Sequence, residues 1–171
     1  TEIGPRLAGT EAEARARAWA VDKLKALGFS NPRIETFTIP GWVRGEERAE
    51  IVTPFPQKIV LTALGHSGAT PAAGLSSEIV TFPSYAAFQA APEALVKGKI
   101  VYVGHRMNRT QDGSSYGSFG QVRRDGPSLA AQRGAAAFLI RSIGTDDHRL
   151  PHTGVTTWAK DVKPIPAAAL S

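Results

Sequence analysis

The strongest constraint on the fold is a series of short strand-like runs in the middle of the chain, from Arg44 onward. Four of these runs are rich in Val, Ile and Thr and are bounded by Gly, Pro or Ser: AEIVTPF, KIVLTAL, SSEIVTF and GKIVYVGH. β-branched side chains favour extended backbone because they pack well on a pleated surface, and Gly and Pro mark the turns. A brief helix over residues 85–96 interrupts the series, and Pro92 limits its length. This region is therefore predicted to be dominated by strands.

An amphipathic helix is predicted before this region, over residues 10–27. Thr10 followed by Glu13 forms a capping box, in which each side chain satisfies a backbone donor at a helix start. Apolar residues then recur at helical spacing, and Gly28 sits where a left-handed C-terminal cap is wanted. The alternation over residues 34–39 predicts one strand. One helix and one strand cannot cover their own apolar faces, so together they form an incomplete unit.

The second half of the chain is predicted to contain a loop, a short helix and a buried strand. Residues 106–126 are polar and glycine-rich, which indicates a loop at the surface. Pro127 suits the first turn of a short helix, and Gly134 suits its end. Residues 135–143, with the sequence AAAFLIRSI, then predict a buried strand.

Composition limits the class of protein. The 171 residues fit one domain, or one domain plus a fragment of another. The net charge of +5 comes from scattered Lys and Arg, so we expect a solvated basic surface and no nucleic-acid partner. The absence of cysteine excludes zinc fingers, thiol nucleophiles and disulfides, but leaves the compartment open. No apolar run approaches the roughly 20 residues that span a bilayer, so no membrane partner is expected.

The two ends of the chain predict that it is an excised piece of something longer. The sequence opens on TEIGPRLAG, with neither an initiator Met nor a leader. It closes on PIPAAALS, where a buried strand is barely finished.

The segment 142–154, SIGTDDHRLPHTG, contains the one tempting metal motif. His148 and His152 stand four apart, as two ligands on one helix face do. Pro151 between them and the flanking glycines deny them that helix. A loop can still bring them to Asp146 or Asp147, but surface histidines in loops are commoner than ligands, so we expect no metal site.

Two further fragments resemble catalytic motifs without completing them. His66-Ser67-Gly68 follows a strand as the Gly-His-x-Asp of many zinc exopeptidases does, but Gly68 brings no oxygen ligand, so we predict a turn at a strand end. Residues 113–117, GSSYG, match G-x-S-x-G, which needs a strand before and a helix after. Polar sequence on both sides predicts a flexible loop instead. The chain therefore has no complete catalytic set of its own, and we predict no catalytic residue in it.

Several short segments follow one another over almost the whole chain: IGPRLAGT, IPGWVRGEERAEI, GKIVYVGH, GAAAFLIRSIG, PHTG and PIPAAALS. Their order resembles the amino-terminal part of carboxypeptidase Q-like zinc exopeptidases, a group that includes plasma glutamate carboxypeptidase and aminopeptidase Y types. Each segment is a weak signal alone, and only the combination is specific.

The resemblance implies an α+β fold in two parts. Residues 1–44 would be the first helix and strand of the α/β zinc-peptidase domain. Residues 45–171 would be an inserted protease-associated (PA) domain, rich in β-sheet, with an open barrel-like or sandwich core and short flanking helices. The two zinc ions of the family are held by residues that follow the PA domain, so the resemblance implies zinc in the full-length parent and none bound by this segment.

The resemblance also implies candidates for substrate contact. In related multi-domain exopeptidases the PA domain closes over the catalytic cleft and can add side chains to the substrate pocket. The candidates here are Arg141, Ser142, His152 and Thr153. Arg141 can offer a forked donor to a carboxylate, and His152 and Thr153 can donate or accept hydrogen bonds. The alternative is that Arg141 and His152 satisfy backbone carbonyls within the loop.

The function predicted from the sequence is a segment of a secreted or periplasmic zinc exopeptidase acting on short peptides. The parent would be the enzyme, and this segment, without zinc ligands, would be inactive. Its expected partners are its own catalytic domain, a short peptide and a second copy in a homodimer. The alternative is a noncatalytic module that binds peptides or proteins through its sheet edge and loops. The sequence leaves carboxypeptidase and aminopeptidase activity equally open.

Overall fold

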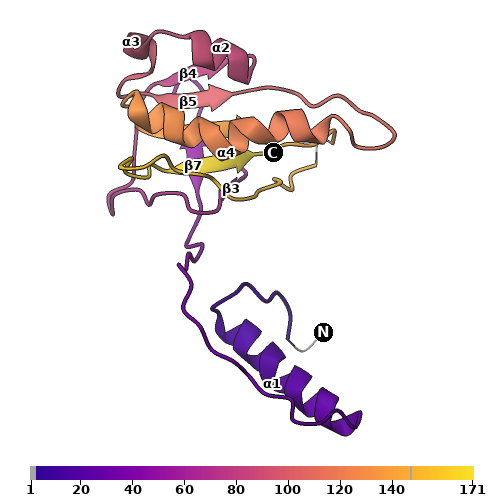
Figure 1. The fold of residues 1–171 in the computed structure, drawn as a ribbon. Helices are drawn as coiled ribbons and strands as arrows, with labels where there is room; N and C mark the ends of the chain where they lie inside the picture. The colour runs from indigo at the N-terminus through magenta and orange to yellow at the C-terminus, as the bar shows by residue number, and fades with distance from the viewer. Residues whose placement is uncertain (1–2, 147) are drawn as a thin grey trace. The chain divides into compact units, whose positions relative to one another are not determined.

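The computed structural model describes residues 3–146 and 148–171. The chain divides into two compact units, one over Thr1–Val43 and one over Arg44–Ser171. The secondary structure of each unit is drawn in Figure 1.

The first unit is built on the helix α1 (Glu11–Ala26). Its start and its end follow the predicted signals, since the Thr10 hydroxyl accepts from the Glu13 N–H at 3.3 Å and Gly28 adopts φ 82°. The predicted helix is therefore confirmed. The predicted strand over residues 34–39 is wrong, because residues 31–48 form no ladder. A β-propensity becomes a strand only where a partner strand supplies hydrogen bonds, and this unit contains none.

The apolar side chains of the first unit are left uncovered. α1 buries none of its residues, and Phe37 is 84% exposed. Further exposed apolar residues of this unit are Leu7, Trp19, Leu24, Leu27, Phe29, Ile34, Ile39 and Val43.

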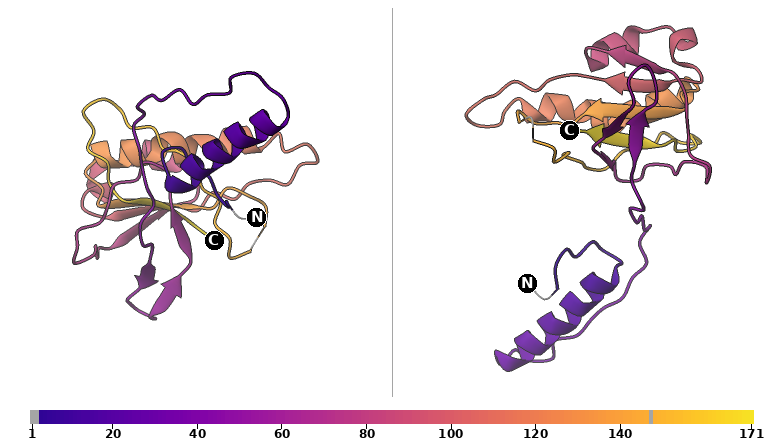
Figure 2. Two further views of the ribbon diagram at one scale, coloured as in Figure 1. Left: turned by 90° about the horizontal axis from the view of Figure 1, so that it is seen from below. Right: turned by 180° about the vertical axis from the view of Figure 1, so that it is seen from behind.

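The second unit contains a five-stranded mixed sheet and a separate hairpin (Figures 1 and 2). The strand order is β3-β7-β6-β5-β4, in which β3 is antiparallel to β7 and the other pairs are parallel. The sheet strands are β3 (Leu61–Ala63), β4 (Ile79–Phe82), β5 (Ile100–Val103), β6 (Ala137–Arg141) and β7 (Ala167–Leu170). The hairpin strands are β1 (Ala49–Ile51) and β2 (Gln57–Ile59). The α+β class is confirmed, whereas the described strands form one open sheet and a hairpin in place of a barrel or sandwich.

Three helices accompany the sheet. α2 (Tyr85–Ala90) and α3 (Glu93–Val96) lie beside β4, and they are separated at Pro92, which confirms that this proline divides the predicted helix. α4 (Tyr116–Gln132) lies along one sheet face, as Figure 2 also shows. The core between α4 and the sheet is made of Val101, Val103, Phe119, Val122, Ala130, Phe138, Ile140, Ala167 and Ala169.

α4 begins eleven residues before the predicted start at Pro127, so the prediction of a surface loop over 106–126 is wrong in its second half. The buried positions Phe119, Val122, Gly126 and Ala130 recur every three or four residues, which is the period of a helix packed on one side. Gly126 makes this packing close, because a Cβ there would lie 2.5 Å from Cζ of Phe138. Glycines and charges in the segment concealed the apolar stripe.

Pro127 lies inside α4 and cannot donate a hydrogen bond to the Arg123 carbonyl four residues earlier. The Thr156 hydroxyl donates to that carbonyl oxygen at 3.3 Å in place of the proline. The Thr157 N–H likewise donates to the Arg124 carbonyl at 2.8 Å. The break in the helical ladder therefore attaches residues 155–157 to the middle of α4.

Candidate functional site

The parallel strands β5, β6 and β7 end at the same edge of the sheet, which is where open α/β sheets bind their ligands. The loop from β5 to α4 and the loop that follows β6 both start there. The second of these loops contains the segment 142–154 that the sequence singled out. The candidate site therefore lies at this edge.

A cavity of about 300 Å³ lies at this edge. Its lining residues are Arg141, Ser142, Ile143, Gly144, Asp146, His148, Leu150, His152 and Ser171. Three of the four predicted contact residues are among them. The fourth, Thr153, follows His152 and directs its carbonyl to Nη1 of Arg123 at 3.4 Å. The structure thus brings three of the four residues together around one space, with Thr153 next to it in sequence, while their contact with a substrate stays a prediction.

His152 is fixed at both its backbone and its ring. Its N–H donates to the Ser142 hydroxyl in a short hydrogen bond. Its Nε2 lies 2.7 Å from the Tyr116 hydroxyl, and the two rings meet edge to face at 5.6 Å between centroids. Because Tyr116 opens α4 and Ser142 follows β6, the imidazole is positioned by two separate elements.

Arg123 lies behind this pair and completes the network. Its Nη1 donates to the Tyr116 hydroxyl at 2.9 Å and lies 3.3 Å from His152 Nε2. The side chain is buried, with 9% of its surface exposed, and its Nε has no hydrogen-bond partner. No carboxylate of residues 3–146 and 148–171 forms an ion pair with it. A cation thus lies close to the imidazole in a partly dry environment.

Gly154 gives Arg123 the space that it occupies. A Cβ at position 154 would lie 2.6 Å from Cζ of Arg123 and 2.8 Å from its Nε. Real Cβ atoms do not approach so closely, so any side chain at this position would displace the buried guanidinium. The glycine in the PHTG segment is therefore required by the network.

The electrostatics of the site favour a neutral histidine. Partial burial of the ring lowers the pKa of His152, and the nearby Arg123 cation lowers it further. On the adjacent strand, burial raises the pKa of the Tyr102 hydroxyl, an effect that Arg141 opposes. Asp146 at the cavity wall pairs with Arg109 at 3.5 Å.

Sequence reasoning missed Tyr116 and Arg123. They lie seven residues apart, so they share one face of α4. Only the helical period could have indicated that the two side chains lie on one face, and the segment was interpreted as a loop.

The GSSYG motif lacks the strand that a nucleophile elbow needs before it. A helix follows, since α4 begins at Tyr116, but β5 ends at Val103, well before the motif. The Ser115 hydroxyl donates to the Asn108 carbonyl at 2.6 Å, and no strained turn after a strand presents it.

The metal motif does not converge among the described residues. Within residues 3–146 and 148–171, no group of three or more His, Asp or Glu side chains could hold a metal ion, and Asp147 lies outside these residues.

The predicted turn at His66 is confirmed, because the Ser67 N–H donates to the Leu64 carbonyl at 3.0 Å. Gly68 is needed there, since a Cβ would lie 2.4 Å from the Pro164 carbonyl oxygen.

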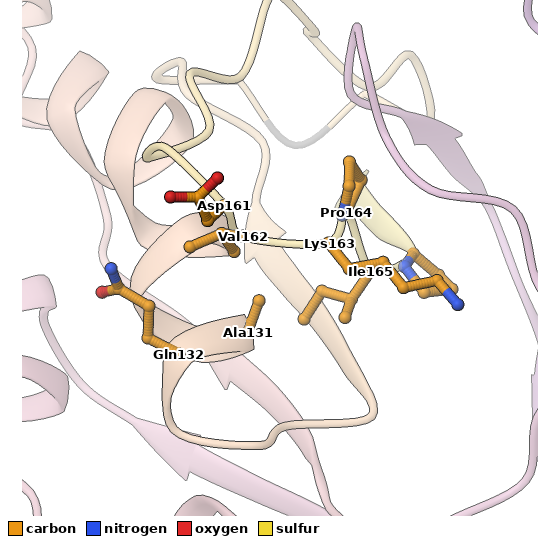
Figure 3. A pocket seen from close by; sticks show the side chains of 8 residues that line it. Ala131, Gln132, Asp161, Val162, Lys163, Pro164 and Ile165 are labelled. Carbon is orange, nitrogen blue, oxygen red and sulfur yellow. The ribbon is translucent and has the colours of Figure 1, made fainter.

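A second cavity, of about 570 Å³, lies at the opposite edge of the sheet, where α4 ends and β7 begins. Figure 3 shows its lining, which includes Gln132, Asp161, Val162 and Ile165. The Asp161 carboxylate and the Ile165 side chain lie on different sides of the space (Figure 3). No converging network of polar side chains comparable to that around His152 is found here among the described residues. The smaller cavity is therefore the better candidate site.

The proteins that are similar to this chain are peptidases, although no family model matches the chain. A peptidase M28 precursor from Shewanella amazonensis is 45% identical, with a TM-score of 0.90 over 99% of this chain and 38% of that one. BSAP, a zinc aminopeptidase from Bacillus subtilis, has a similar fold, with a TM-score of 0.55 and 19% identity over 99% of this chain and 35% of that one.

Among curated proteins, the chain is similar to carboxypeptidase Q. The protein from Bos taurus is 35% identical over 170 residues, which cover 99% of this chain and 34% of that protein. The chain is therefore a homologue of carboxypeptidase Q along almost its whole length. It spans about a third of the length of the curated relatives that it matches.

Proposed function

We propose that the chain is a segment of a zinc-dependent exopeptidase that hydrolyses short peptides. The observation that carries this proposal is the 35% identity to carboxypeptidase Q from Bos taurus over 170 residues. The similar fold of a zinc aminopeptidase from Bacillus subtilis supports zinc as the metal, and we expect two ions in the full-length parent.

The described residues do not fit a zinc centre. Gly68 supplies no oxygen, and its contact with the Pro164 carbonyl leaves no room for an aspartate. The Nε2 of His152 already lies within hydrogen-bond distance of Tyr116 and Arg123. The zinc ligands and the catalytic base are therefore proposed to come from other parts of the parent.

Residues 1–44 are proposed to belong to the catalytic domain of that parent. The support is energetic, since an isolated helix with no buried residue gains little from packing. The exposed apolar side chains, Trp19 and Phe37 among them, would be covered by the missing part of the peptidase domain.

Residues 45–171 are proposed to form a protease-associated domain that covers the catalytic cleft and controls substrate access. The support is the cavity at the carboxyl edge of the sheet, around which Arg141, Ser142 and His152 gather. Attachment of the loop to α4 through Thr156 gives these side chains a fixed support. In this proposal the four predicted residues contact the peptide.

Secretion or export to a periplasm and assembly as a homodimer are part of the same proposal. No helix among the described residues is long and apolar enough to cross a membrane. Light scattering of the full-length parent would test the dimer, and fractionation of cells that express it would test the compartment.

The test of the peptidase proposal is an assay of the full-length parent with dipeptides. We expect hydrolysis that a chelator abolishes and zinc restores, and no hydrolysis by the 171-residue chain under the same conditions. A zinc-loaded parent that cleaves no peptide would contradict the proposal. A parent sequence without a His-x-Asp step and later acidic ligands would favour the noncatalytic binding module.

A further inference from the structure

The network around His152 has a direction, because one of its members can only donate. A guanidinium has no acceptor atom, so Arg123 Nη1 donates to the Tyr116 oxygen at 2.9 Å. The same Nη1 is directed at His152 Nε2 at 3.3 Å. If Nε2 were protonated, its N–H would point toward the N–H of Arg123, and the two groups would repel each other. This arrangement favours Nε2 as the unprotonated nitrogen, although the two N–H groups of Nη1 are shared with the Thr153 carbonyl oxygen at 3.4 Å.

The Tyr116 hydroxyl agrees with this direction. Its oxygen accepts from Arg123, and its proton is then free to be donated to Nε2 at 2.7 Å. Two donors thus converge on one ring nitrogen. A neutral imidazole with an unprotonated Nε2 carries its proton on Nδ1.

Nδ1 is the polar atom of the ring that remains for a ligand. His152 lines the cavity of about 300 Å³, whereas Tyr116 and Arg123 do not. None of the described residues accepts a hydrogen bond from Nδ1. The contacts to Nε2 therefore leave Nδ1–H as the remaining donor of a ring that lines the cavity.

We propose that His152 is a substrate-binding residue that donates a hydrogen bond from Nδ1–H, as a neutral imidazole, to a carbonyl or carboxylate oxygen of a peptide. Tyr116 and Arg123 are positioning residues that fix this tautomer. The assignment of the peptide as ligand rests on the proposed function, whereas the tautomer is inferred from the contacts of Nε2 with Tyr116 and Arg123. The role differs from those of a metal ligand and a general base, both of which need an unprotonated nitrogen facing the ligand.

The tautomer can be measured in the 171-residue chain labelled with ¹⁵N-histidine. A long-range ¹H–¹⁵N spectrum at neutral pH should show Nδ1 of His152 as the protonated nitrogen and Nε2 as the unprotonated one, with assignment from the peaks that His152→Asn removes. The Tyr116→Phe substitution removes one of the two donors to Nε2. In this variant the ¹⁵N chemical shift of His152 Nε2 should therefore move toward the value of a protonated nitrogen. An Nε2–H tautomer in the unmodified chain would overturn the proposal.

The binding role is tested in the full-length parent with two amide substitutions. An asparagine amide overlays Nδ1 of the ring, whereas a glutamine amide reaches the position of Nε2. We expect His152→Asn to keep KM for a dipeptide within about threefold and His152→Gln to raise KM about tenfold, which corresponds to the loss of one hydrogen bond. In both variants kcat should change less than KM. His66→Asn, an exposed residue outside the cavity at a φ of 66° that asparagine tolerates, is the matched control.

The outcomes separate this proposal from the proposed function. If the parent cleaves peptides, and both amide variants leave KM unchanged or both raise it equally, the donor role of Nδ1 is wrong while the peptidase proposal stands. If the parent cleaves no peptide, the peptidase proposal and the peptide ligand are both wrong, whatever the spectrum shows.

Discussion

The Thr156 hydroxyl donates to the Arg123 carbonyl oxygen at 3.3 Å, and this is the carbonyl that Pro127 leaves without a helical donor. The pair joins the middle of α4 to the loop that ends beside His152. A local defect in the helix is thus the attachment point of the candidate site.

Replacing Thr156 with Val should destabilise the second unit by about 1–3 kcal/mol, because the Arg123 carbonyl is then buried without a donor. Denaturant unfolding measures the change. Thr157→Val is the matched control: Thr157 is exposed and uses only its backbone N–H, so it should change stability by less than about 0.5 kcal/mol. Equal effects of the two substitutions would contradict the role given to the hydroxyl.

Gly154→Ala should displace the Arg123 guanidinium, because the new Cβ would lie 2.6 Å from Cζ. We expect a loss of about 1–3 kcal/mol in the free energy of unfolding, as in an overpacked core. The same loop offers a control in Gly144, where a Cβ would meet nothing within 4 Å. If Gly154→Ala is as mild as Gly144→Ala in thermal unfolding, the close contact with Arg123 is incorrect.

The same substitution should have opposite signs at two positions of α4. Gly126→Ala should destabilise by about 1–3 kcal/mol, since its Cβ would lie 2.5 Å from the Phe138 ring. Gly117→Ala meets nothing within 4 Å and should stabilise by up to about 1 kcal/mol through helix propensity. Unfolding of both variants by denaturant tests the prediction. A stabilising Gly126→Ala would mean that α4 packs less closely on β6.

The stability of the second unit should fall as the pH drops below about 6.5, the ordinary pKa of histidine. The pKa of His152 is lowered in the folded state by burial and by Arg123, so the unfolded chain binds the proton at a higher pH. Protonation therefore favours unfolding, and the loss is complete below the folded pKa. Unfolding curves between pH 7.5 and pH 5 should show a smaller decline for His152→Asn than for the unmodified chain.

A titration of the ring by NMR checks the same effect directly. His152 should titrate below the ordinary pKa of histidine, about 6.5. A His152 pKa at or above that value would contradict the effect of Arg123 and of partial burial on the ring.

Much of the fold could be predicted from local patterns. The cap at Thr10, the break at Pro92 and the apolar run before Arg141 each determined an element without help from distant residues. The strand expected over 34–39 failed because strands need partners, and the start of α4 was missed because charged and glycine residues mask its apolar stripe. The need for glycine at position 126 cannot be predicted from local sequence, because it depends on Phe138, which packs against it in the folded structure.

The candidate site was predictable in part. His152 stood out through its spacing from His148, and the family resemblance implied it, with Arg141, Ser142 and Thr153, as a candidate for substrate contact. Tyr116 and Arg123, by contrast, meet His152 across 36 and 29 residues of sequence, and no local motif indicates that contact. The direction of the network emerged only from the distances, because composition does not reveal which nitrogen a guanidinium faces.

The strand order also bears on how the second unit is made. β7 lies between β3 and β6, so Leu61 pairs with Leu170. A ribosome adds about 5–20 residues per second, so β3 waits roughly 5–20 s for the strand that joins it to the sheet. During that interval β3 presents an unpaired edge to other chains. The sheet is therefore completed by insertion of a late strand, and newly made copies depend on holding β3 apart until β7 emerges.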